Sequence, residues 1–513
     1  MNLEKLVQGV EGVTVKGDRK TEISDLAYDS RKVTPGALFF AVPGIHVDGM
    51  QFVGEALQSG AKAVVVPAGT PAAGARGIVE AVDLRRAMAQ MAARFFGDPS
   101  RELVLIGVTG TNGKTSFTYL MESILRQAGL QPGVMGTISY RYGKETFRPA
   151  NTTPESVDLQ RILREMVQAG VTHALLEVSS HGLDFHRVEG CHFACAVFTM
   201  LGRDHLDHHG SMEAYFASKS VLFTRILPRS AVKDRVAVLN RDDPYGRRLM
   251  ELTPVPVVSV GKAEGADYRL ETATCDRRGT SLRIRTPKGA LELRSPLLAA
   301  VNAMNILTAV AVSDRLGLGE GAIVRGIEAV DRIPGRLDRI PNDRGFLVLV
   351  DYAHTPDALD RTLAGVRDLT PGRLITVFGC GGDRDRGKRP LMGEAAARWS
   401  DLLLVTSDNP RSEPPEGIIQ EILEGIRNPE LAFTDRTGIA NAQAGERAFT
   451  AVVDRREAIE LALRTAGEGD TVVVAGKGHE DVQITGEGKV PFRDDEEVMR
   501  ALRATGNKES ALG

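Results

Sequence analysis

The chain has 513 residues, of which 42% are hydrophobic and 26% charged, and 64 Lys and Arg nearly balance 67 Asp and Glu to leave a net charge of -3. This composition is typical of folded globular proteins and gives no reason to expect a nucleic acid or a membrane surface as partner. No signal segment opens the chain, and no apolar run reaches the roughly 18 residues of a membrane-spanning helix. We therefore expect a cytoplasmic protein of about three domains.

The N-terminal part of the chain predicts a small α/β domain. Its two apolar runs, at 37–42 and 61–67, are short and separated by Gly and Pro, as expected of strands in a small sheet. The polar segment 97–102 then predicts a linker, and the pattern changes after it. We place the first domain at residues 1–98.

From Leu103 onward the chain repeats one pattern, in which a β-branched apolar run ends in small or charged residues. Alternation of such runs with helices predicts mostly parallel sheets, whose functional loops follow the carboxyl ends of the strands. A break at 333–340 divides this pattern, which predicts a central domain at 99–334 and a C-terminal domain at 335–513. The polar tail after Ala501 is expected to be frayed.

Polar motifs follow four predicted strands of the C-terminal domain. They are DYAHTPD (351–357), GCGGDRDRGKR (379–389), SDNPRSEPP (407–415) and GKGHEDVQ (476–483). Because the carboxyl ends of parallel strands meet at one edge of a sheet, these motifs predict one composite site.

A glycine-rich loop between an apolar strand and an amphipathic helix predicts a phosphate site. Residues 107–115 read GVTGTNGKT. Backbone N–H groups and the helix N-terminus would bind phosphate oxygens, Lys114 would reach the terminal phosphates, and the Thr115 hydroxyl is a natural Mg²⁺ ligand. The strict P-loop pattern requires glycine at position 108, where this chain has valine. The alternative, a turn without a ligand, is disfavoured by the combination of strand, loop, lysine and helix.

Two further patterns concern metals. Glu177 ends the next predicted strand and could hold Mg²⁺, although a single acid is more often at the surface or ion-paired. The His- and Cys-rich stretch 181–209 invites a zinc hypothesis. However, Cys191 and Cys195 lie in or beside an apolar strand and there is no pair of C-x-x-C units, which favours buried free cysteines. On spacing alone, His205 is a weak Mg²⁺ candidate.

These motifs resemble those of the Mur ligase family. The family shares TGTNGKT (109–115), which accounts for the valine at 108. The other shared motifs run through essentially the whole chain: DSRKVTPGALFFAVPG, NTTPE, LEVSSHGL, FTMLGRDHLDHHG, YFASK, DYAHTPD, GCGGDRDRGKRPLMG, SDNPRSE and GKGHE. The resemblance implies a cytoplasmic ligase of peptidoglycan synthesis that uses ATP and Mg²⁺ to form an amide bond, and we expect it to be a monomer. The implied fold is a small N-terminal α/β domain that anchors a UDP-linked substrate, a central P-loop ATPase domain and a Rossmann-like C-terminal domain.

The resemblance also implies roles for residues at matching positions. The nucleotide set is Gly110, Thr111, Asn112, Gly113, Lys114, Thr115, Ser116, Asn305 and Asp351. Arg336 would contact the γ-phosphate. Ser30 would contact the UDP end of the substrate, and the muramoyl-peptide would contact Thr152, Thr153, Ser179 and Arg187. Related enzymes have Gln at the position of Phe185, so one polar substrate contact is in doubt.

The implied metal set is Thr115, Glu177, His205 and Lys219, and the implied catalytic set is Lys114, Lys219, Glu177, His205 and Arg336. Lys219 matches a lysine that the family carbamylates. A carbamate is an anion able to support a second Mg²⁺, whereas a plain lysine would repel it. Without the resemblance, a solvated helix lysine would be the better interpretation.

The tetrapeptide Asp408, Asn409, Pro410 and Arg411 would ordinarily be read as a turn. Within the family, arginine after proline resembles enzymes that add meso-2,6-diaminopimelate, because a guanidinium can hold its second carboxylate bidentately. Arg384, Gly476 and Glu480 match the remaining amino-acid contacts. The expected acceptor is UDP-N-acetylmuramoyl-L-alanyl-D-glutamate.

Three alternatives stay open at this point. The same ligase could add L-lysine. A folylpolyglutamate synthetase-like ligase would share the ATPase and C-terminal domains but would lack the N-terminal unit. A regulatory NTPase would hydrolyse nucleotide without forming an amide.

Overall fold

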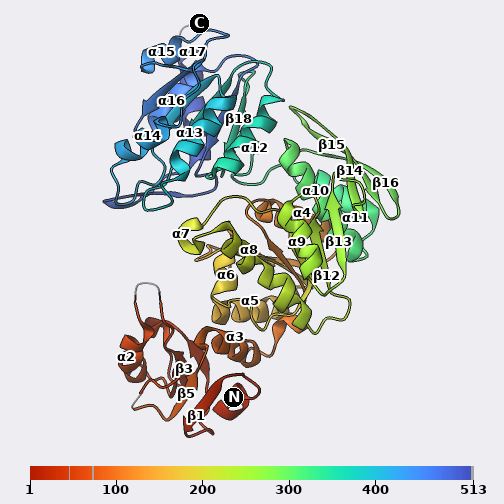
Figure 1. The fold of residues 1–513 in the computed structure, drawn as a ribbon, viewed down its shortest axis with the longest axis vertical. Helices are drawn as coiled ribbons and strands as arrows, with labels where there is room; N and C mark the ends of the chain where they lie inside the picture. The colour runs from red at the N-terminus through yellow and green to blue at the C-terminus, as the bar shows by residue number, and fades with distance from the viewer. Residues whose placement is uncertain (45–46, 72–73, 510–513) are drawn as a thin grey trace.

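The computed structural model describes residues 1–44, 47–71 and 74–509 and consists of three α/β domains arranged one after another (Figure 1). The N-terminal domain lies at one end, the central domain in the middle and the C-terminal domain at the other end. Each domain is built on its own sheet. The predicted fold class is therefore confirmed, while the domain boundaries after residues 98 and 334 stay predictions.

The N-terminal domain contains a five-stranded sheet in the order β1-β5-β4-β3-β2. Its elements are α1 (Leu3–Val7), β1 (Val13–Gly17), β2 (Asp25–Ala27), β3 (Ala37–Phe40), α2 (Val53–Gln58), β4 (Ala63–Pro67), β5 (Gly77–Ala81) and α3 (Leu84–Phe95). The two predicted strands are β3 and β4, and both are buried because helices cover the two faces of the sheet. Helix α3 also packs against α5 of the central domain, which attaches the small domain to the larger one.

The central domain is built on an eleven-stranded sheet in the order β16-β15-β14-β13-β12-β11-β6-β10-β7-β8-β9. Its strands are β6 (Val104–Thr109), β7 (Pro132–Met135), β8 (Tyr140–Tyr142), β9 (Glu145–Phe147), β10 (His173–Glu177), β11 (Phe193–Phe198), β12 (Val236–Asn240), β13 (Val257–Gly261), β14 (Tyr268–Asp276), β15 (Gly279–Thr286) and β16 (Gly289–Ser295). Strands β14 to β7 pair in parallel, as predicted, and antiparallel hairpins extend both edges.

Helices cover both faces of this sheet. They are α4 (Lys114–Gln127), α5 (Ser156–Gln168), α6 (Ser180–Asp184), α7 (Leu206–His209), α8 (Met212–Val221), α9 (Pro244–Leu252), α10 (Ala300–Arg315) and α11 (Glu320–Glu328). Successive residues of a strand point to opposite faces, so Ile106 joins the core beneath α4 and α10 while Leu105 joins the core beneath α5. The predicted linker is a short 3-10 helix at Pro99–Arg101.

The C-terminal domain has a seven-stranded sheet in the order β17-β18-β23-β19-β20-β22-β21. Its elements are β17 (Asp338–Arg339), β18 (Leu347–Asp351), α12 (Pro356–Arg367), β19 (Leu374–Phe378), α13 (Lys388–Trp399), β20 (Leu402–Thr406), α14 (Pro415–Leu423), β21 (Ala432–Phe433), α15 (Arg436–Asn441), β22 (Ala448–Val452), α16 (Arg455–Thr465), β23 (Thr471–Ala475), a hairpin of β24 (Val482–Thr485) and β25 (Gly488–Pro491), and α17 (Asp494–Glu509). The four strands that precede the polar motifs are β18, β19, β20 and β23, and they pair in parallel.

Helix α17 extends to Glu509, and its first part is held by Val498 and Ala501, which are buried in the core that α16 also contacts. The expected fraying of the tail after Ala501 stays a prediction. Residues 510–513 lie outside the described part of the chain.

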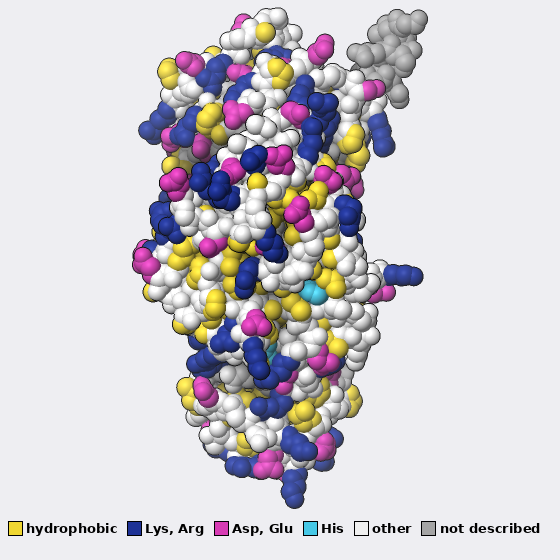
Figure 2. Space-filling model, turned by 90° about the vertical axis from the view of Figure 1, so that its right-hand side faces the viewer, with side chains coloured by type: hydrophobic (Ala, Val, Ile, Leu, Met, Phe, Trp, Pro, Cys, Tyr) yellow, Lys and Arg dark blue, Asp and Glu magenta, His cyan; other side chains and the backbone are white. Residues whose placement is uncertain are grey.

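The surface carries no large patch of one charge on the face seen in Figure 2, where basic and acidic side chains are interspersed. Among the helices of the described residues, none is both long and apolar enough to cross a membrane.

Candidate functional site

A cavity of about 310 Å³ lies where the central and C-terminal domains meet. Thirteen of the predicted site residues line it: Thr111, Asn112, Gly113, Lys114, Thr115, Ser116, Thr152, Ser179, His205, Lys219, Asn305, Arg336 and Asp351. The structure therefore brings most of the predicted nucleotide and metal residues to one place.

The structure explains why the glycine-rich loop departs from the strict P-loop pattern at position 108. Strand β6 continues to Thr109, so Val108 is a fully buried strand residue and no backbone turn is needed there. The turn is made by Gly110 and Gly113, with φ of 141° and 90°. A Cβ on Gly110 would lie 1.9 Å from Thr199 Oγ1, so a side chain at this position is excluded by space as well as by conformation.

Two lysines lie side by side beneath this loop, Lys219 fully buried and Lys114 half-buried. Lys114 Nζ donates to the carbonyls of Gly110 and Thr111 at 2.8 and 2.9 Å, and Lys219 Nζ donates to Gly110 O at 3.1 Å. Burial lowers the pKa of Lys114, and burial together with Lys114 lowers the pKa of Lys219 well below its ordinary value. In the described part of the chain, neither lysine is ion-paired with a carboxylate, so no acidic side chain of the protein balances an ammonium at either position.

Lys219 is not the solvated helix lysine that its position in α8 would suggest, because its side chain is only 1% exposed. It lies one turn after Tyr215 on the same helix face, and its Nζ is 4.7 Å from the centre of the Tyr215 ring. Tyr215 is itself buried and exchanges a hydrogen bond with Thr111 at 3.2 Å. Lys219 therefore reaches the phosphate loop because it lies on the buried face of α8.

Arg336 reaches the phosphate loop from the segment that connects the central and C-terminal domains. Its Nη2 lies 3.4 Å from Thr115 Oγ1, and its guanidinium stacks 4.6 Å from the Tyr352 ring. This position is suited to a terminal phosphate, as predicted.

Asn305 and Asp351 line the same cavity with part of their polar groups already engaged. A Cβ on Gly113 would lie 2.5 Å from Asn305 Oδ1, so Asn305 packs directly on the loop. The Asp351 carboxylate accepts from the N–H groups of Leu337 and Ala353 at 2.7 and 2.9 Å, and burial raises its pKa. Their predicted contacts with adenine and ribose stay predictions.

Glu177 is buried at the end of β10 and is held by a hydroxyl chain. Thr137 Oγ1 donates to Glu177 Oε2 at 2.7 Å and lies 3.1 Å from Thr152 Oγ1. A Cβ on Gly136 would lie 2.3 Å from Glu177 Oε1, so only glycine lets the carboxylate approach here. These contacts link the candidate metal ligand Glu177 with the predicted substrate residue Thr152.

His205 faces the same cavity beside a carboxylate that the sequence argument did not single out. Asp204 Oδ2 lies 3.4 Å from His205 Nε2 and 3.8 Å from Nε2 of His354, which comes from the C-terminal domain. Burial lowers the pKa of His205 to about 4, so its imidazole is neutral and able to bind a metal ion at neutral pH.

The predicted peptide contacts are partly engaged within the protein. Thr153 is fully buried and donates to Glu177 O at 2.8 Å, and Ser179 caps α6 by accepting from Gly182 N at 3.0 Å. Arg187 is ion-paired with Glu155 at 2.6 Å. Neither Thr153 nor Arg187 lines the cavity, whereas Ser179 does.

Phe185 occupies a cationic environment. Arg187 lies 5.5 Å from the ring centre, and Arg85 from the N-terminal domain lies 4.6 Å from it. Arg85 also lies 3.5 Å from Glu155. The apolar ring therefore holds two guanidiniums in place at the domain junction, a role that a glutamine would fill only by hydrogen bonding.

Ser30 lies apart from this cavity, in the N-terminal domain. Its hydroxyl donates to Glu55 Oε2 at 3.0 Å. The predicted amino-acid contacts also do not line the cavity and form a second group at the edge of the C-terminal sheet.

The second group is organised around a buried lysine that the sequence argument missed. Lys477 Nζ donates to Asn409 Oδ1 at 3.1 Å and to Glu480 Oε2 at 3.0 Å, and it lies 3.9 Å from Asp408 Oδ1. Asn409 Nδ2 donates to Glu480 Oε2 at 2.7 Å. A Cβ on Gly476 would lie 2.6 Å from Asp408 Oδ2. The motifs after β20 and β23 therefore meet, as predicted.

Arg411 and Arg384 lie close together in this group. Arg411 has a left-handed backbone conformation, with φ of 53°, and its Nη1 donates to Gly382 O at 2.6 Å. Burial, followed by the charge of Arg384, lowers the pKa of Arg411. Neither guanidinium is ion-paired within the residues that the structure covers, so the two charges can serve an external carboxylate.

Several residues that form the site were not singled out from sequence. They are Thr137, Thr199, Asp204, Tyr215, Tyr352, His354 and Lys477. Six of them, all except Thr137, stand inside motifs that the sequence argument quoted, so the signal was present although these residues were not chosen.

Comparisons with known proteins agree with this geometry. Three family models match: "Mur ligase family, catalytic domain" over residues 22–96, "Mur ligase middle domain" over 108–313 and "Mur ligase, glutamate ligase domain" over 335–478. A UDP-N-acetylmuramoyl-L-alanyl-D-glutamate--2,6-diaminopimelate ligase from Geobacter sulfurreducens is 48% identical over 99% of this chain and 100% of its own.

Solved structures of ligases with similar folds also match this chain. A structure of a UDP-N-acetylmuramoyl-L-alanyl-D-glutamate--2,6-diaminopimelate ligase has a TM-score of 0.68 and 32% identity, and covers 99% of both chains. MurF ligase from Thermotoga maritima, solved in complex with ADP, is 19% identical with a TM-score of 0.64, covers 95% of this chain and 99% of its own, and shows the same fold. The resemblance seen in the motifs is confirmed, and the chain belongs to the Mur ligase family.

Proposed function

We propose that this protein adds meso-2,6-diaminopimelate to UDP-N-acetylmuramoyl-L-alanyl-D-glutamate, with cleavage of ATP to ADP and phosphate, in cytoplasmic peptidoglycan synthesis. Relatives with this name match the chain over its whole length, at 48% identity in the case above. The observation that carries the proposal is the convergence of Lys114, Lys219 and Arg336 on one loop, at a cavity that the peptide-site residues Thr152 and Ser179 also line.

The reaction requires activation of a carboxylate, since its charge is delocalised and oxide is a poor leaving group. Transfer of the γ-phosphoryl group of ATP to the carboxylate gives an acyl phosphate and ADP. The amine then attacks the acyl carbon, and phosphate leaves as the amide forms. Lys114 and Arg336 would neutralise charge on the transferring phosphoryl group, and no protein nucleophile is needed.

The residues present fit Mg²⁺ in their chemistry. Thr115 and His205 line the cavity and offer a hydroxyl oxygen and a neutral imidazole, and Glu177, buried at the end of β10, offers a carboxylate. Such an ion, when bound, polarises phosphate oxygens. The chain itself places Thr115 at the phosphate loop and keeps the Glu177 carboxylate buried, away from bulk water.

Carbamylation of Lys219 is part of the proposal. Burial, followed by the charge of Lys114, lowers the pKa of Lys219, which favours the neutral amine that reacts with carbon dioxide. The resulting anion would lie beside Lys114, where a second ammonium is electrostatically unfavourable.

For the other end of the reaction, we assign the amino-acid site to the group around Arg411. Arg411 and Arg384 would hold the distal carboxylate of diaminopimelate, and Glu480, already close to Lys477, would receive an ammonium group. Ser30 is assigned to the UDP end because it lies in the N-terminal domain, beyond the peptide residues. The monomeric state stays a prediction.

A phosphate-release assay tests the proposal. The protein is expected to release phosphate from ATP only when both the UDP-linked dipeptide and meso-diaminopimelate are present, because phosphate leaves only after amine attack. A Lys114→Met variant should show no release and serves as the background control.

Two other outcomes would contradict the proposal. Hydrolysis that needs neither substrate would favour a regulatory NTPase. Release that depends on a folate and glutamate instead would favour a folylpolyglutamate synthetase-like ligase.

A further inference from the structure

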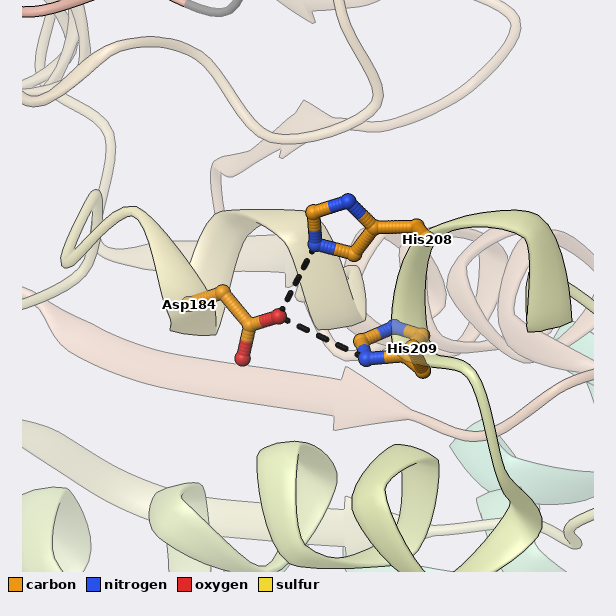
Figure 3. Close-up of side chains that lie close together, drawn as sticks. All are labelled: Asp184, His208 and His209. Atoms are coloured by element: carbon orange, nitrogen blue, oxygen red, sulfur yellow. Dashed lines mark hydrogen bonds and ion pairs between the residues drawn. The ribbon is translucent and has the colours of Figure 1, made fainter.

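Three metal-ligating side chains gather on the rim of the central domain, outside the proposed Mg²⁺ site. Asp184 ends α6, while His208 and His209 end α7 (Figure 3). Asp184 Oδ2 lies 3.1 Å from His208 Nε2 and 3.5 Å from His209 Nδ1. Two rings and one carboxylate therefore point at a common position.

The distances suit a tetrahedral ion. Ligand atoms on one tetrahedral Zn²⁺ lie about 3.4 Å apart, because Zn–N and Zn–O bonds are about 2.0–2.2 Å long. The two Asp–His contacts, 3.1 Å to the hydrogen-bonded His208 and 3.5 Å to His209, lie close to this length, and all three ligand atoms lie within 4.8 Å of one another. His208 is partly exposed, and a small rotation of its ring would close the remaining edge.

Neighbouring groups orient the two imidazoles. His209 Nε2 lies 2.9 Å from Ser180 Oγ, so when Nε2–H donates to that hydroxyl, Nδ1 keeps the lone pair that faces Asp184. The His208 ring stacks on the His181 ring with their centres 4.2 Å apart. A polar partner behind one ligand and a stacked ring behind the other are the supports that a metal-binding imidazole requires.

We propose that Asp184, His208 and His209 form a Zn²⁺ site that fastens α6 to α7. Two imidazoles and one carboxylate are a zinc ligand set that leaves one position for water, whereas Mg²⁺ prefers oxygen ligands. The cysteines in this stretch play no part, because Cys191 and Cys195 are buried in the core. The zinc site is therefore made by histidines and an aspartate that the sequence separates by more than twenty residues.

The proposed Zn²⁺ site is connected through the backbone to Ser179 and His205, which line the cavity of the proposed reaction centre. Helix α6 begins directly after Ser179, and α7 begins directly after His205. The His205 carbonyl accepts from the N–H groups of His208 and His209 at 3.1 and 3.0 Å. An ion that joins α6 to α7 would therefore fix the loop that carries His205.

A zinc titration tests this site. Metal-free protein in saturating Mg²⁺ is titrated with Zn²⁺ against a chromophoric competitor, and about one Zn²⁺ should bind per chain. His208→Ala and Asp184→Asn are each expected to weaken binding at least about tenfold. His173→Ala removes a histidine outside the cluster and should change nothing, and His205→Ala should retain binding.

Thermal unfolding provides a second measurement, because Zn²⁺ should raise the Tm of the wild type but not that of Asp184→Asn. Asp184 and His208 are partly exposed, so these variants are expected to fold. Unchanged zinc affinity in both His208→Ala and Asp184→Asn would overturn the proposal. Loss of binding in His205→Ala alone would also overturn it, since the ion would then lie at the magnesium site.

Discussion

Replacement of Lys219 by methionine is expected to lower kcat by about a hundred- to a thousandfold, the loss that follows removal of one preorganised electrostatic group. The lysine is buried against the phosphate loop, and its proposed carbamate supplies an anion that no other described side chain brings to this position. Steady-state phosphate release with both substrates measures the effect.

Stability separates this loss from misfolding. Methionine has nearly the length of lysine and carries no charge, and replacing a buried charge by an apolar side chain is often neutral or stabilising. The Tm of Lys219→Met should therefore equal or exceed that of the wild type. Lys262→Ala, which removes an exposed lysine from the same domain, should leave both kcat and Tm unchanged.

Lys219→Arg and Lys219→Glu then decide between the two charges that the site could require. Arginine keeps a cation but cannot be carbamylated, so it should be as inactive as methionine. Glutamate restores a shorter anion and should retain more activity than either. Wild-type activity in Lys219→Arg would show that the site needs a cation and that the carbamate plays no role.

The sequence could predict those parts of the structure whose conformation is determined by residues within one short segment of the chain. The phosphate loop is such a case, because strand, glycines, lysine and helix are contiguous, and even Val108 is explained by the continuation of β6 to Thr109. The same holds for the four polar motifs of the C-terminal domain, since each follows an apolar run whose length and β-branching mark a buried strand.

The parts that sequence could not predict depend on contacts between distant segments. The sequence predicted that the motifs after β20 and β23 would meet, but not that Lys477 would be the buried side chain that contacts Asn409, because that contact joins residues far apart in the chain. Likewise Arg85 meets Phe185 only because α3 packs on α5.

The antiparallel hairpins at the edges of the central sheet were missed for a different reason. Residues 282–285 and 291–294 alternate apolar and charged side chains, which is the pattern of half-buried antiparallel strands, and β15 and β16 form that hairpin. This signal was available, but the pattern of parallel strands and helices around it was stronger. The eleven-stranded sheet therefore exceeds the predicted one at both edges.

Arg411 is expected to set the choice of amino acid. The wild type should use meso-diaminopimelate roughly a hundredfold better than L-lysine, measured as kcat/KM, because lysine lacks the second carboxylate and would leave the half-buried Arg411 desolvated without a partner. Paired assays with the two amino acids at the same concentration of UDP-linked dipeptide measure this ratio.

Arg411→Ala should reduce the preference to about tenfold or less, chiefly by raising the KM for diaminopimelate, because the guanidinium binds a part of the substrate remote from the reacting amine. Arg386→Ala is the matched control. Arg386 lies in the same polar motif as Arg384 but is exposed and paired with Glu421, so its removal should leave the ratio unchanged.

Equal use of the two amino acids by the wild type would refute the assignment of this site to diaminopimelate. It would leave the ligase proposal intact, because activation of the carboxylate depends on Lys114, Lys219 and Arg336 in a different cavity. If Arg411→Ala kept the preference for diaminopimelate over lysine, the second carboxylate would instead be recognised by Arg384, whose charge already lowers the pKa of Arg411. The double variant Arg384→Ala/Arg411→Ala should then lose the preference that the single variant keeps.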